Sequence, residues 1–425
     1  MFQHILGKLG QGPYVPEDRT KSNQIVGTSP INLVQEVGGI LPIKTKIDTL
    51  DDVIQALGYK KEYEVVGRGE QAVVTSIETH SKKEVVLRIK RKFVNNEHST
   101  LGSFVENHNI LKTIYLHGGK VPKSIAVGAI KDSSNIMYPF QIQEKIGEGI
   151  NLSDILNTFK ILPPELAITY ALEITGTTRM IDLSGYIHRD LKPANILCDE
   201  NGHPFISDFG LKREKTNPIT SDVRVGTPDY MAPEYFNKEA NFLITDRHAI
   251  SVMLYEMCIG RKPFTPIYSP LELLRMSKLP QNVAQHKVVK DIYFNAKQGN
   301  YKKVAPEIIQ RGGSEKLASS LDAFFEKSFK KRHNSIFELH SDISRLYLNF
   351  AHDYKERIDE RKKEAYSKTL EIVKSQNIDK KDPRYKSGQR YAAKNRPRES
   401  TKPEEGSQPF KIAPTVILKR TRKYY

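Results

Sequence analysis

The stretch "YIHRDLKPANILCDENGHPFISDFG", residues 186–210, is the most informative part of this chain. It brings a carboxylate, Asp190, and a lysine, Lys192, to within two residues of each other. A carboxylate accepts a hydrogen bond from a hydroxyl and orients it, and a nearby lysine offsets the charge of an anionic group. Asn195 and Asp208 supply the hard oxygen atoms that Mg²⁺ prefers as ligands. The stretch therefore brings together a hydrogen-bond acceptor for a hydroxyl, a cation and hard oxygen atoms.

The spacing of these residues resembles that of a known family. H-R-D-L-K-P-x-N at residues 188–195 followed by D-F-G at 208–210 resembles the catalytic and metal-binding loops of the eukaryotic-type protein kinases. The resemblance implies that Asp190 orients the attacking hydroxyl, that Lys192 contacts the transferring phosphate, and that Asn195 and Asp208 hold the metal. ATP and Mg²⁺ are the cofactors it implies. A lone aspartate before glycine would indicate only a surface turn, and the length of the run argues against that interpretation.

The segment "GTPDYMAPE", residues 226–234, resembles the end of the activation loop in the same family, with Glu234 as its last residue. Lys192 and Thr227 are the residue types that the family's serine/threonine kinases carry. A phosphate in the loop before Gly226 would find a natural partner in Arg189, because arginine pairs well with a doubly negative group. Three hydroxyl residues there are candidates, and each fits an ordinary solvated loop equally well: Thr216, Thr220 and Ser221.

The resemblance extends into "ITDRHAISVMLYEM", residues 244–257. Asp246 matches the aspartate that, in the family, hydrogen-bonds the catalytic-loop backbone from the start of a buried helix. His248 stands where the family usually has an aromatic residue. The resemblance therefore predicts a buried helix here, with Asp246 beneath the catalytic loop.

Alternating apolar residues predict three short strands before this region. They are "YEVVGRG", "AVVTSIET" and "KEVVLRIK", which we expect to form a β-meander followed by a helix near "FVENHNILKTIYL". "VGRGEQAVV" fits the family's glycine-rich pattern at Gly67, Gly69, Ala72 and Val74. Glycines let a backbone approach phosphates closely, although a hairpin turn also needs glycine.

The third strand offers two cations, Arg88 and Lys90, where the family has one phosphate-binding lysine. Residues 86, 88 and 90 share one face of a strand. The family places a small residue two positions before the lysine, and Val86 fits that position if Arg88 is the phosphate-binding residue. A bulge in the strand would instead present Lys90. The register favours Arg88, an exchange that is not conservative.

The acidic partner of that cation is also ambiguous. The family pattern E-x-x-I-L places Asn107 at the glutamate position, with Glu106 one residue earlier. A turn of the helix would be needed to present Glu106. Glu144 completes the predicted nucleotide-binding residues.

We predict an α+β, bilobal protein-kinase-like fold with a small antiparallel N-lobe and a larger helical C-lobe. The expected parts are a leader over residues 1–60, a kinase domain over 61–345 and a basic helical extension with a flexible tail over 346–425. The lobes are expected over about 61–147 and 148–345. The leader should be loosely structured up to residue 47 and then form a short helix at "DTLDDVIQALG", capped by Thr49 or Asp48.

The formal net charge of +16 lies mostly near the C-terminus, where residues 351–425 hold 21 Lys and Arg against 11 Asp and Glu. Tyrosines are interleaved with these cations, among them Tyr385, Tyr391, Tyr424 and Tyr425. Such a segment is a candidate for weak contact with nucleic acid or an anionic membrane surface. A solvated helix and disordered segment, with no such partner, explain the composition as well.

Only Cys198 and Cys258 are present, too few for a disulfide framework, which favours a reducing compartment such as the cytoplasm. We expect neither a secretory signal nor a transmembrane segment. The divergent N-lobe suits a bacterial effector or viral protein delivered to a host cytosol.

Two functions from different classes remain. The first is a kinase that transfers the γ-phosphate of Mg-ATP to serine or threonine hydroxyls of protein substrates. The second is a pseudokinase scaffold that binds partners without efficient transfer, as Arg88, Asn107 and Ala72 would suggest. A third option, a kinase-like fold acting on small molecules, is disfavoured by "GTPDYMAPE", which belongs to a loop that the family uses to hold peptides.

Overall fold

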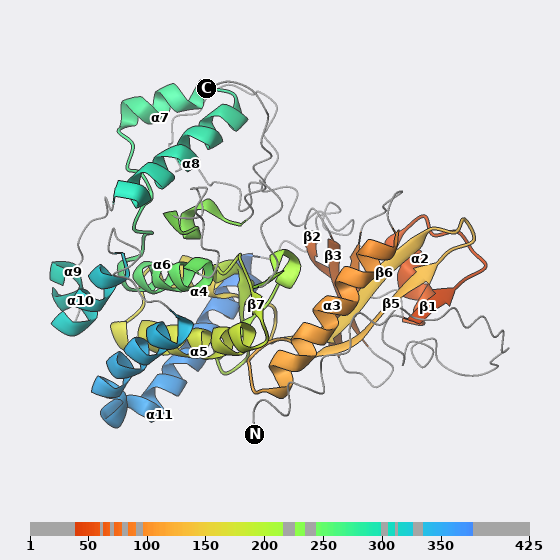
Figure 1. Ribbon diagram of the computed structural model, residues 1–425, viewed down its shortest axis with the longest axis horizontal. Coiled ribbons are helices and arrows are strands. Elements are labelled where there is room, and N and C mark those ends of the chain that lie inside the picture. Colours follow the sequence, from red (N-terminus) through yellow and green to blue (C-terminus); the bar gives the residue numbers. More distant parts are fainter. Residues whose placement is uncertain are drawn as a thin grey trace.

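The computed structural model of this chain describes residues 39–59, 63–68, 72–78, 84–90, 97–215, 226–233, 244–298, 305–310, 313–325 and 335–376. A strand-rich N-lobe and a helical C-lobe lie side by side (Figure 1). The predicted bilobal α+β fold is therefore confirmed. The N-lobe comprises β1 (Gly39–Pro42), α2 (Leu50–Ala56), β2 (Tyr63–Arg68), β3 (Ala72–Glu78), β4 (Glu84–Lys90), α3 (Glu97–Leu116), β5 (Ser124–Lys131) and β6 (Met137–Glu144).

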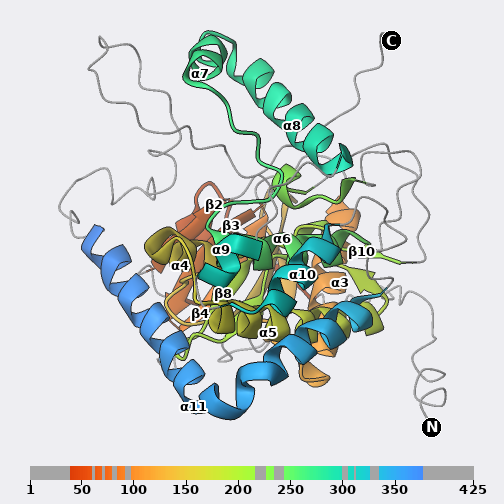
Figure 2. The same cartoon turned by 90° about the vertical axis from the view of Figure 1, so that its left-hand side faces the viewer.

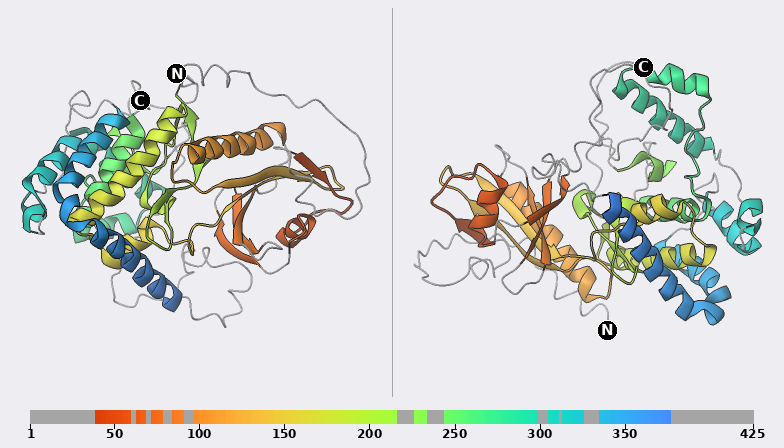
Figure 3. Two further views of the ribbon diagram at one scale, coloured as in Figure 1. Left: turned by 90° about the horizontal axis from the view of Figure 1, so that it is seen from below. Right: turned by 180° about the vertical axis from the view of Figure 1, so that it is seen from behind.

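The N-lobe sheet has six strands in the order β1-β5-β6-β4-β3-β2. β2, β3 and β4 pair with their neighbours in antiparallel fashion, which confirms the predicted meander. β1 is the exception, because it pairs with β5 in parallel. α3 lies against one side of the sheet and α2 against the other (Figure 3).

The leader contributes β1 and α2 to the N-lobe core. Of the two candidate caps, Thr49 provides the side chain that accepts the Asp52 N–H, and Asp52 reciprocates in a capping box. Leu41, Val53 and Ile54 are buried with apolar side chains of the sheet. The sequence predicted the helix but missed β1, because a four-residue strand, "GILP", is too short to show alternation.

Replacing Ile54 by Ala tests whether the leader stabilises the lobe. Ile54 is fully buried, so its truncation should leave a cavity and lower the free energy of unfolding by about 2–4 kcal/mol. Gln55 is exposed on the same helix, and Gln55→Ala serves as the matched control. Urea unfolding measures both, and equal midpoints for the two variants would contradict a structural role for α2.

The C-lobe is built around two buried helices, α5 (Pro164–Leu183) and α6 (Thr245–Ile259). α7 (Pro270–Ser277) and α8 (Gln281–Gln298) extend away from them (Figure 2). The other C-lobe elements are α4 (Leu152–Phe159), β7 (Tyr186–Ile187), β8 (Ile196–Cys198), β9 (Pro204–Ile206), β10 (Arg213–Glu214), α9 (Ala305–Gln310), α10 (Glu315–Phe324) and α11 (Ile336–Gln376).

α11 passes beneath the C-lobe along α5 and then rises along its outer side towards α4 (Figure 2). This single helix spans residue 346, where we predicted the basic extension to begin. The predicted flexible tail lies outside the described residues. Within the described parts of the chain, no helix combines the length and the apolar character needed to cross a bilayer.

His248 occupies an apolar position on α6. Its ring stacks on Phe264 with centroids 5.9 Å apart and meets the edge of Phe325 at 6.0 Å. In the described part of the chain, neither ring nitrogen has a hydrogen-bond partner. Burial lowers the pKa of His248 to about 4, so the ring is neutral at pH 7.

Replacing His248 by Phe should change how stability depends on pH. The unfolded chain binds a proton at His248 below its ordinary pKa of about 6.5, whereas the folded chain does not until about pH 4. Acidification within that window should therefore destabilise the parent protein, and His248→Phe should gain about 2–3 kcal/mol relative to the parent between pH 7 and pH 4.5. Paired denaturation curves at both pH values, with the exposed His117→Phe as control, measure this gain. A difference in unfolding free energy between His248→Phe and the parent that stays constant with pH would contradict this prediction.

Candidate active site

The catalytic loop begins after β7 and is held from below by α6. The Asp246 carboxylate accepts the backbone N–H groups of His188 at 2.7 Å and Arg189 at 2.8 Å, which confirms the role expected for Asp246. Complete burial raises the pKa of Asp246, while the charges of His188 and Arg189 and these backbone bonds oppose the rise. Arg189 has a φ of 70°, an uncommon conformation for a residue with a side chain. The buried carboxylate therefore holds a strained turn in front of Asp190.

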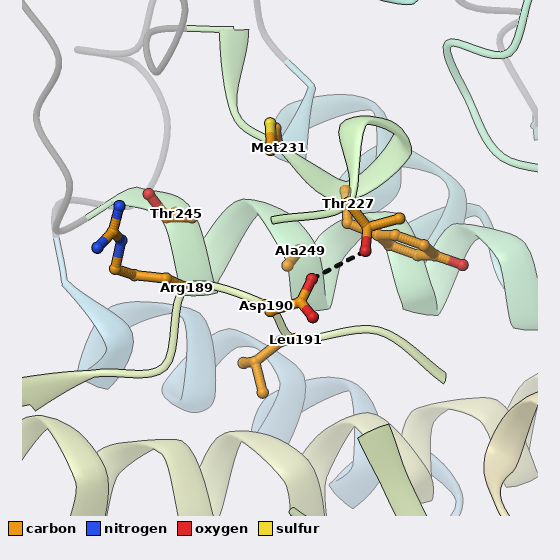
Figure 4. Close-up of a pocket in the computed structure, with 8 residues that line it drawn as sticks. Arg189, Asp190, Leu191, Thr227, Met231, Thr245 and Ala249 are labelled. Carbon is orange, nitrogen blue, oxygen red and sulfur yellow. Dashed lines mark hydrogen bonds between the residues drawn. The ribbon is translucent and has the colours of Figure 1, made fainter. Parts of the chain in front are cut away.

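Asp190 is the centre of a hydrogen-bonded cluster. Its Oδ2 accepts Lys192 Nζ at 2.7 Å, and its Oδ1 accepts the Thr227 hydroxyl at 2.8 Å (Figure 4). Lys192 Nζ also donates to Thr227 Oγ1 at 2.9 Å. Asn195 Nδ2 donates to the backbone carbonyl of Asp190 at 2.8 Å and to its Oδ2 at 3.2 Å. The four side chains therefore orient one another in a nearly dry setting.

A small pocket opens beside this cluster, where Arg189 points away from the Asp190 carboxylate towards Thr245 (Figure 4). It is lined by Arg189, Asp190, Leu191, Thr227, Tyr230, Met231, Thr245 and Ala249. Gly226 lies next to it with a φ of 121°, and a Cβ there would come within 2.8 Å of the Arg189 carbonyl. Glycine at this position lets Thr227 reach Asp190.

The metal-binding loop is joined directly to the catalytic loop. Ser207 donates its backbone N–H at 2.9 Å and its hydroxyl at 3.0 Å to the Asn195 carbonyl. His188 Nε2 lies 2.9 Å from the Ser207 carbonyl, and its ring packs edge-on against Phe209. Asp208 follows with a left-handed φ of 60°. These contacts place the two predicted metal ligands, Asn195 and Asp208, in neighbouring backbone segments.

Arg88 contacts the metal-binding loop from the N-lobe. Its Nη2 donates to Asp208 Oδ1 at 3.1 Å. Partial burial would raise the pKa of Asp208, but the Arg88 guanidinium, His188 and Lys192 outweigh it and hold the pKa below its ordinary value. Asp208 is therefore ionised at neutral pH, as a metal ligand must be.

The strand register bears on the choice between Arg88 and Lys90. Arg88 lies opposite Val74 of β3 and Gln141 of β6, in the centre of the sheet, with its side chain 18% exposed. Lys90 is the last residue of β4, and its side chain lies outside the described residues. The structure places Arg88 against Asp208.

The helix α3 presents Asn107 to the sheet. Asn107 is buried and donates to Gln141 Oε1 at 2.9 Å, whereas Glu106 is half-exposed and pairs with Lys212 Nζ at 3.3 Å. The ion pair that the structure describes for Glu106 therefore joins α3 to the segment after D-F-G, and not to Arg88. Neutral Asn107 occupies the inward position that the family pattern assigns to glutamate.

Asn107 belongs to a buried polar network that sequence reasoning missed. Gln141 Nε2 donates to Ser124 Oγ at 2.8 Å, and His108 Nδ1 lies 2.9 Å from the same oxygen. Burial and nearby Lys112 lower the pKa of His108, which keeps its ring neutral. The only sequence signal was Asn107 itself, because nothing local relates it to Gln141.

The remaining predicted site residues are distributed as follows. Gly67 lies at a register irregularity in β2, and Val74 lies in β3. Glu144 ends β6, where Lys123 donates its backbone N–H to the side chain at 3.4 Å. Those outside the described residues are Gly69, Thr216, Thr220, Ser221 and Glu234.

The donor set is suited to a nucleotide with a divalent cation. Asn195 and Asp208 would hold the metal through oxygen atoms, and Arg88 and Lys192 would provide the positive charge that phosphates need. Asp208 is ionised and Asn195 is oriented by its hydrogen bond to Asp190, so both side chains are in a state suited to holding a metal ion.

Comparison with known proteins agrees with this geometry. Residues 60–340, about two-thirds of the chain, match the protein kinase domain family. The serine/threonine-protein kinase AtPK1/AtPK6 of Arabidopsis thaliana is 39% identical over 100 residues, which are 24% of this chain and 22% of that protein. Rho-associated protein kinase 1 of Homo sapiens is 29% identical over 232 residues, which are 51% of this chain and 16% of that protein.

Citron Rho-interacting kinase of Homo sapiens is similar to the same extent, with 29% identity over 230 residues, 51% of this chain and 11% of that protein. The chain thus spans less than a quarter of the length of each of these curated relatives. The matched region contains every described residue of the Asp190 cluster. The chain therefore belongs to the protein kinase family, as a eukaryotic-type serine/threonine member.

Proposed function

We propose that this chain is an active protein kinase that transfers the γ-phosphate of Mg-ATP to serine or threonine hydroxyls of protein substrates, within residues 61–345. The observation that carries the proposal is the Asp190 cluster. Thr227, Lys192 and Asn195 all donate to one buried carboxylate, as an orienting acceptor for an incoming hydroxyl requires.

Asp190 accepts a hydrogen bond from the substrate hydroxyl and so aligns the hydroxyl oxygen for attack on the phosphate. Lys192 can turn from Asp190 to the transferred group and offset its negative charge. When bound, Mg-ATP would supply the phosphoryl group, and Asn195 and Asp208 would hold its metal. Since positioning and charge account for nearly all of the catalysis in this reaction, these residues suffice for the chemistry.

Arg88 takes the place of the phosphate-binding lysine in this proposal. Arginine stays charged at any physiological pH and offers several N–H donors, so one side chain can contact both Asp208 and a phosphate oxygen. Its 3.1 Å contact with Asp208 supports this assignment. Gly67, Gly69, Val74 and Glu144 complete the proposed nucleotide-binding residues.

The segment after Thr227 supports a peptide substrate. Asp229 pairs with Lys262 at 3.1 Å, and the Tyr230 hydroxyl donates to Glu256 at 2.5 Å. Burial raises the pKa of Glu256. These contacts hold the segment against Glu256 of α6 and against Lys262, three residues after the end of that helix.

A pseudokinase is the second candidate, and one observation favours it. Asn107 carries no charge, and its Oδ1 has no hydrogen-bond partner among the described residues. Asn107 therefore cannot form the ion pair by which a glutamate at this position of α3 would hold a phosphate-binding cation of β4. The Asp190 cluster outweighs this loss, because it lies nearer to the transferred phosphate.

We also propose a reducing compartment such as the cytoplasm as the place of action. Cys198 and Cys258 are both buried, and neither is part of a disulfide. Burial raises the pKa of the Cys198 thiol above its ordinary range, so this residue is an unreactive part of the core.

Intact mass spectrometry with a basic serine-containing peptide, before and after Mg-ATP, tests the proposed activity. A gain of one phosphate on peptide or protein, absent in Asp208→Ala, is the expected result. No gain with either Mg²⁺ or Mn²⁺ would reject the kinase. Calorimetric titration of the same sample with Mg-ADP would then separate a nucleotide-binding pseudokinase from one that has lost the nucleotide.

A further inference from the structure

The two lobes are joined by residues 145–149, which we call the linker. It runs from the end of β6 to Asn151, the cap of α4. Gly147 and Gly149 both have positive φ, at 47° and 77°. Lys145 pairs with Glu148 at 3.0 Å and with Glu84 of β4. Because this short segment alone connects β6 with α4, its position sets how far the N-lobe residues lie from Asp208.

The distal half of α11, residues 358–376, docks beside the linker through a buried lysine. Lys362 has a side chain 2% exposed, and its Nζ lies 2.8 Å from both Glu173 of α5 and Asp359 of its own helix. Burial disfavours the ionised form of Glu173, but Lys362 and Lys120 outweigh it, and the pKa lies below its ordinary value. A buried, doubly paired ammonium of this kind fixes one orientation of the helix.

Two glycines permit the close approach of α11. A Cβ on Gly202, in the turn between β8 and β9, would lie 2.4 Å from the Lys362 carbonyl. A Cβ on Gly147 would lie 2.7 Å from the Tyr366 hydroxyl and 2.7 Å from the Cys198 carbonyl. The backbone of the catalytic lobe is therefore in direct contact with α11 at both points.

Tyr366 makes the only hydrogen bond described between α11 and the linker. Its ring is buried in the C-lobe core, and its hydroxyl oxygen accepts the Glu148 N–H at 2.8 Å. Two residues further along, Lys368 lies over the Phe159 ring of α4 at 5.4 Å. The helix thus contacts both the linker and the adjoining α4.

We propose that Tyr366 is a positioning residue for nucleotide binding. Its hydroxyl fixes the linker against the C-lobe, and so fixes the separation between Arg88 in the N-lobe and Asp208 in the C-lobe. The nucleotide part of this proposal rests on the proposed function, whereas the restraint on the linker does not. On this proposal, α11 (Ile336–Gln376) contributes to nucleotide binding through Tyr366, although it does not contact the nucleotide.

Tyr366→Phe removes the hydroxyl and keeps the packed ring. The loss of one hydrogen bond of about 1 kcal/mol should raise amide exchange in the linker by roughly five- to tenfold. The dissociation constant of Mg-ADP should rise by roughly two- to fivefold, because a less restrained linker must be ordered when the nucleotide binds.

Thr369→Val is the matched control. Thr369 is a fully buried hydroxyl three residues further along, and its Oγ1 donates to the Ala365 carbonyl of its own helix. The substitution removes a hydroxyl from the same helix, at a residue whose hydroxyl bonds within the helix and not to the linker. The amide exchange rate of the linker and the dissociation constant of Mg-ADP should both stay at the parental value in this variant.

The experiment combines hydrogen–deuterium exchange of the nucleotide-free full chain with calorimetric titration by Mg-ADP. Faster linker exchange and weaker Mg-ADP binding in Tyr366→Phe alone would support the proposal. Parental exchange at residues 145–149 would overturn the restraint, and faster exchange with unchanged affinity would overturn its link to the nucleotide. If the parent protein binds no Mg-ADP, the proposed nucleotide site fails, and the exchange data still decide the restraint.

Discussion

Asp190→Asn should lower the turnover number by about 10²–10⁴-fold and leave the affinity for Mg-ADP nearly unchanged. Both carboxylate oxygens of Asp190 accept hydrogen bonds, from Lys192 and from Thr227. An amide has one acceptor oxygen, so the NH₂ group of the new side chain would face either Lys192 or Thr227, which are both donors. The side chain would also lack the negative charge with which Asp190 accepts the substrate hydroxyl. Initial rates of peptide phosphorylation, with calorimetric Mg-ADP titration, measure the two quantities.

Asp182→Asn is the control for a loss of charge elsewhere in the C-lobe. Asp182 pairs with Lys215 at 2.6 Å at the end of α5, and both side chains are partly exposed. Its replacement should leave turnover at the parental level, since exposed pairs contribute little. Turnover preserved in Asp190→Asn would remove Asp190 from the mechanism. Joint loss of turnover and nucleotide affinity would instead indicate a structural role.

Arg88→Ala should lower kcat/KM for ATP by about 10²–10³-fold. The change leaves Asp208 without its 3.1 Å partner and removes a charged donor from the proposed nucleotide site, and the loss of one such preorganised donor costs about 10²–10³-fold in rate. Arg88→Lys should retain more activity than Arg88→Ala, because it keeps the charge, but less than the parent, because the forked donors are lost. Steady-state kinetics at varied ATP concentration separate KM from kcat.

Lys90→Ala is the matched comparison for Arg88→Ala. The two residues share one face of β4, so both variants remove a cation from the same strand. We expect Lys90→Ala to change kcat/KM by less than about threefold, because Arg88 is the cation that we propose contacts the phosphates. The reverse order would assign the phosphate contact to Lys90. Equal, small effects would exclude both and favour the pseudokinase.

The local chemistry of the site was predictable from the sequence alone. Asp190, Lys192 and Asn195 lie within one loop, and their contacts with one another follow from a spacing of a few residues. The meander of β2, β3 and β4 was predictable for the same reason, since alternation and tight turns are local signals. The cap on α2 required only Thr49 and Asp52, three residues apart.

The tertiary structure decided what joins these local pieces. Arg88 and Asp208 are 120 residues apart, and the Glu148 N–H and the Tyr366 hydroxyl are 218 apart. Such pairs depend on how the lobes and α11 pack, and neither residue type nor spacing encodes that packing. Glu106 shows the same limit, because a rotation of one residue on α3 sends it to Lys212 and turns Asn107 inward. Local motifs are therefore enough to indicate the family and the groups of the catalytic loop, whereas the packing of distant segments places Arg88 against Asp208 and Tyr366 against the linker.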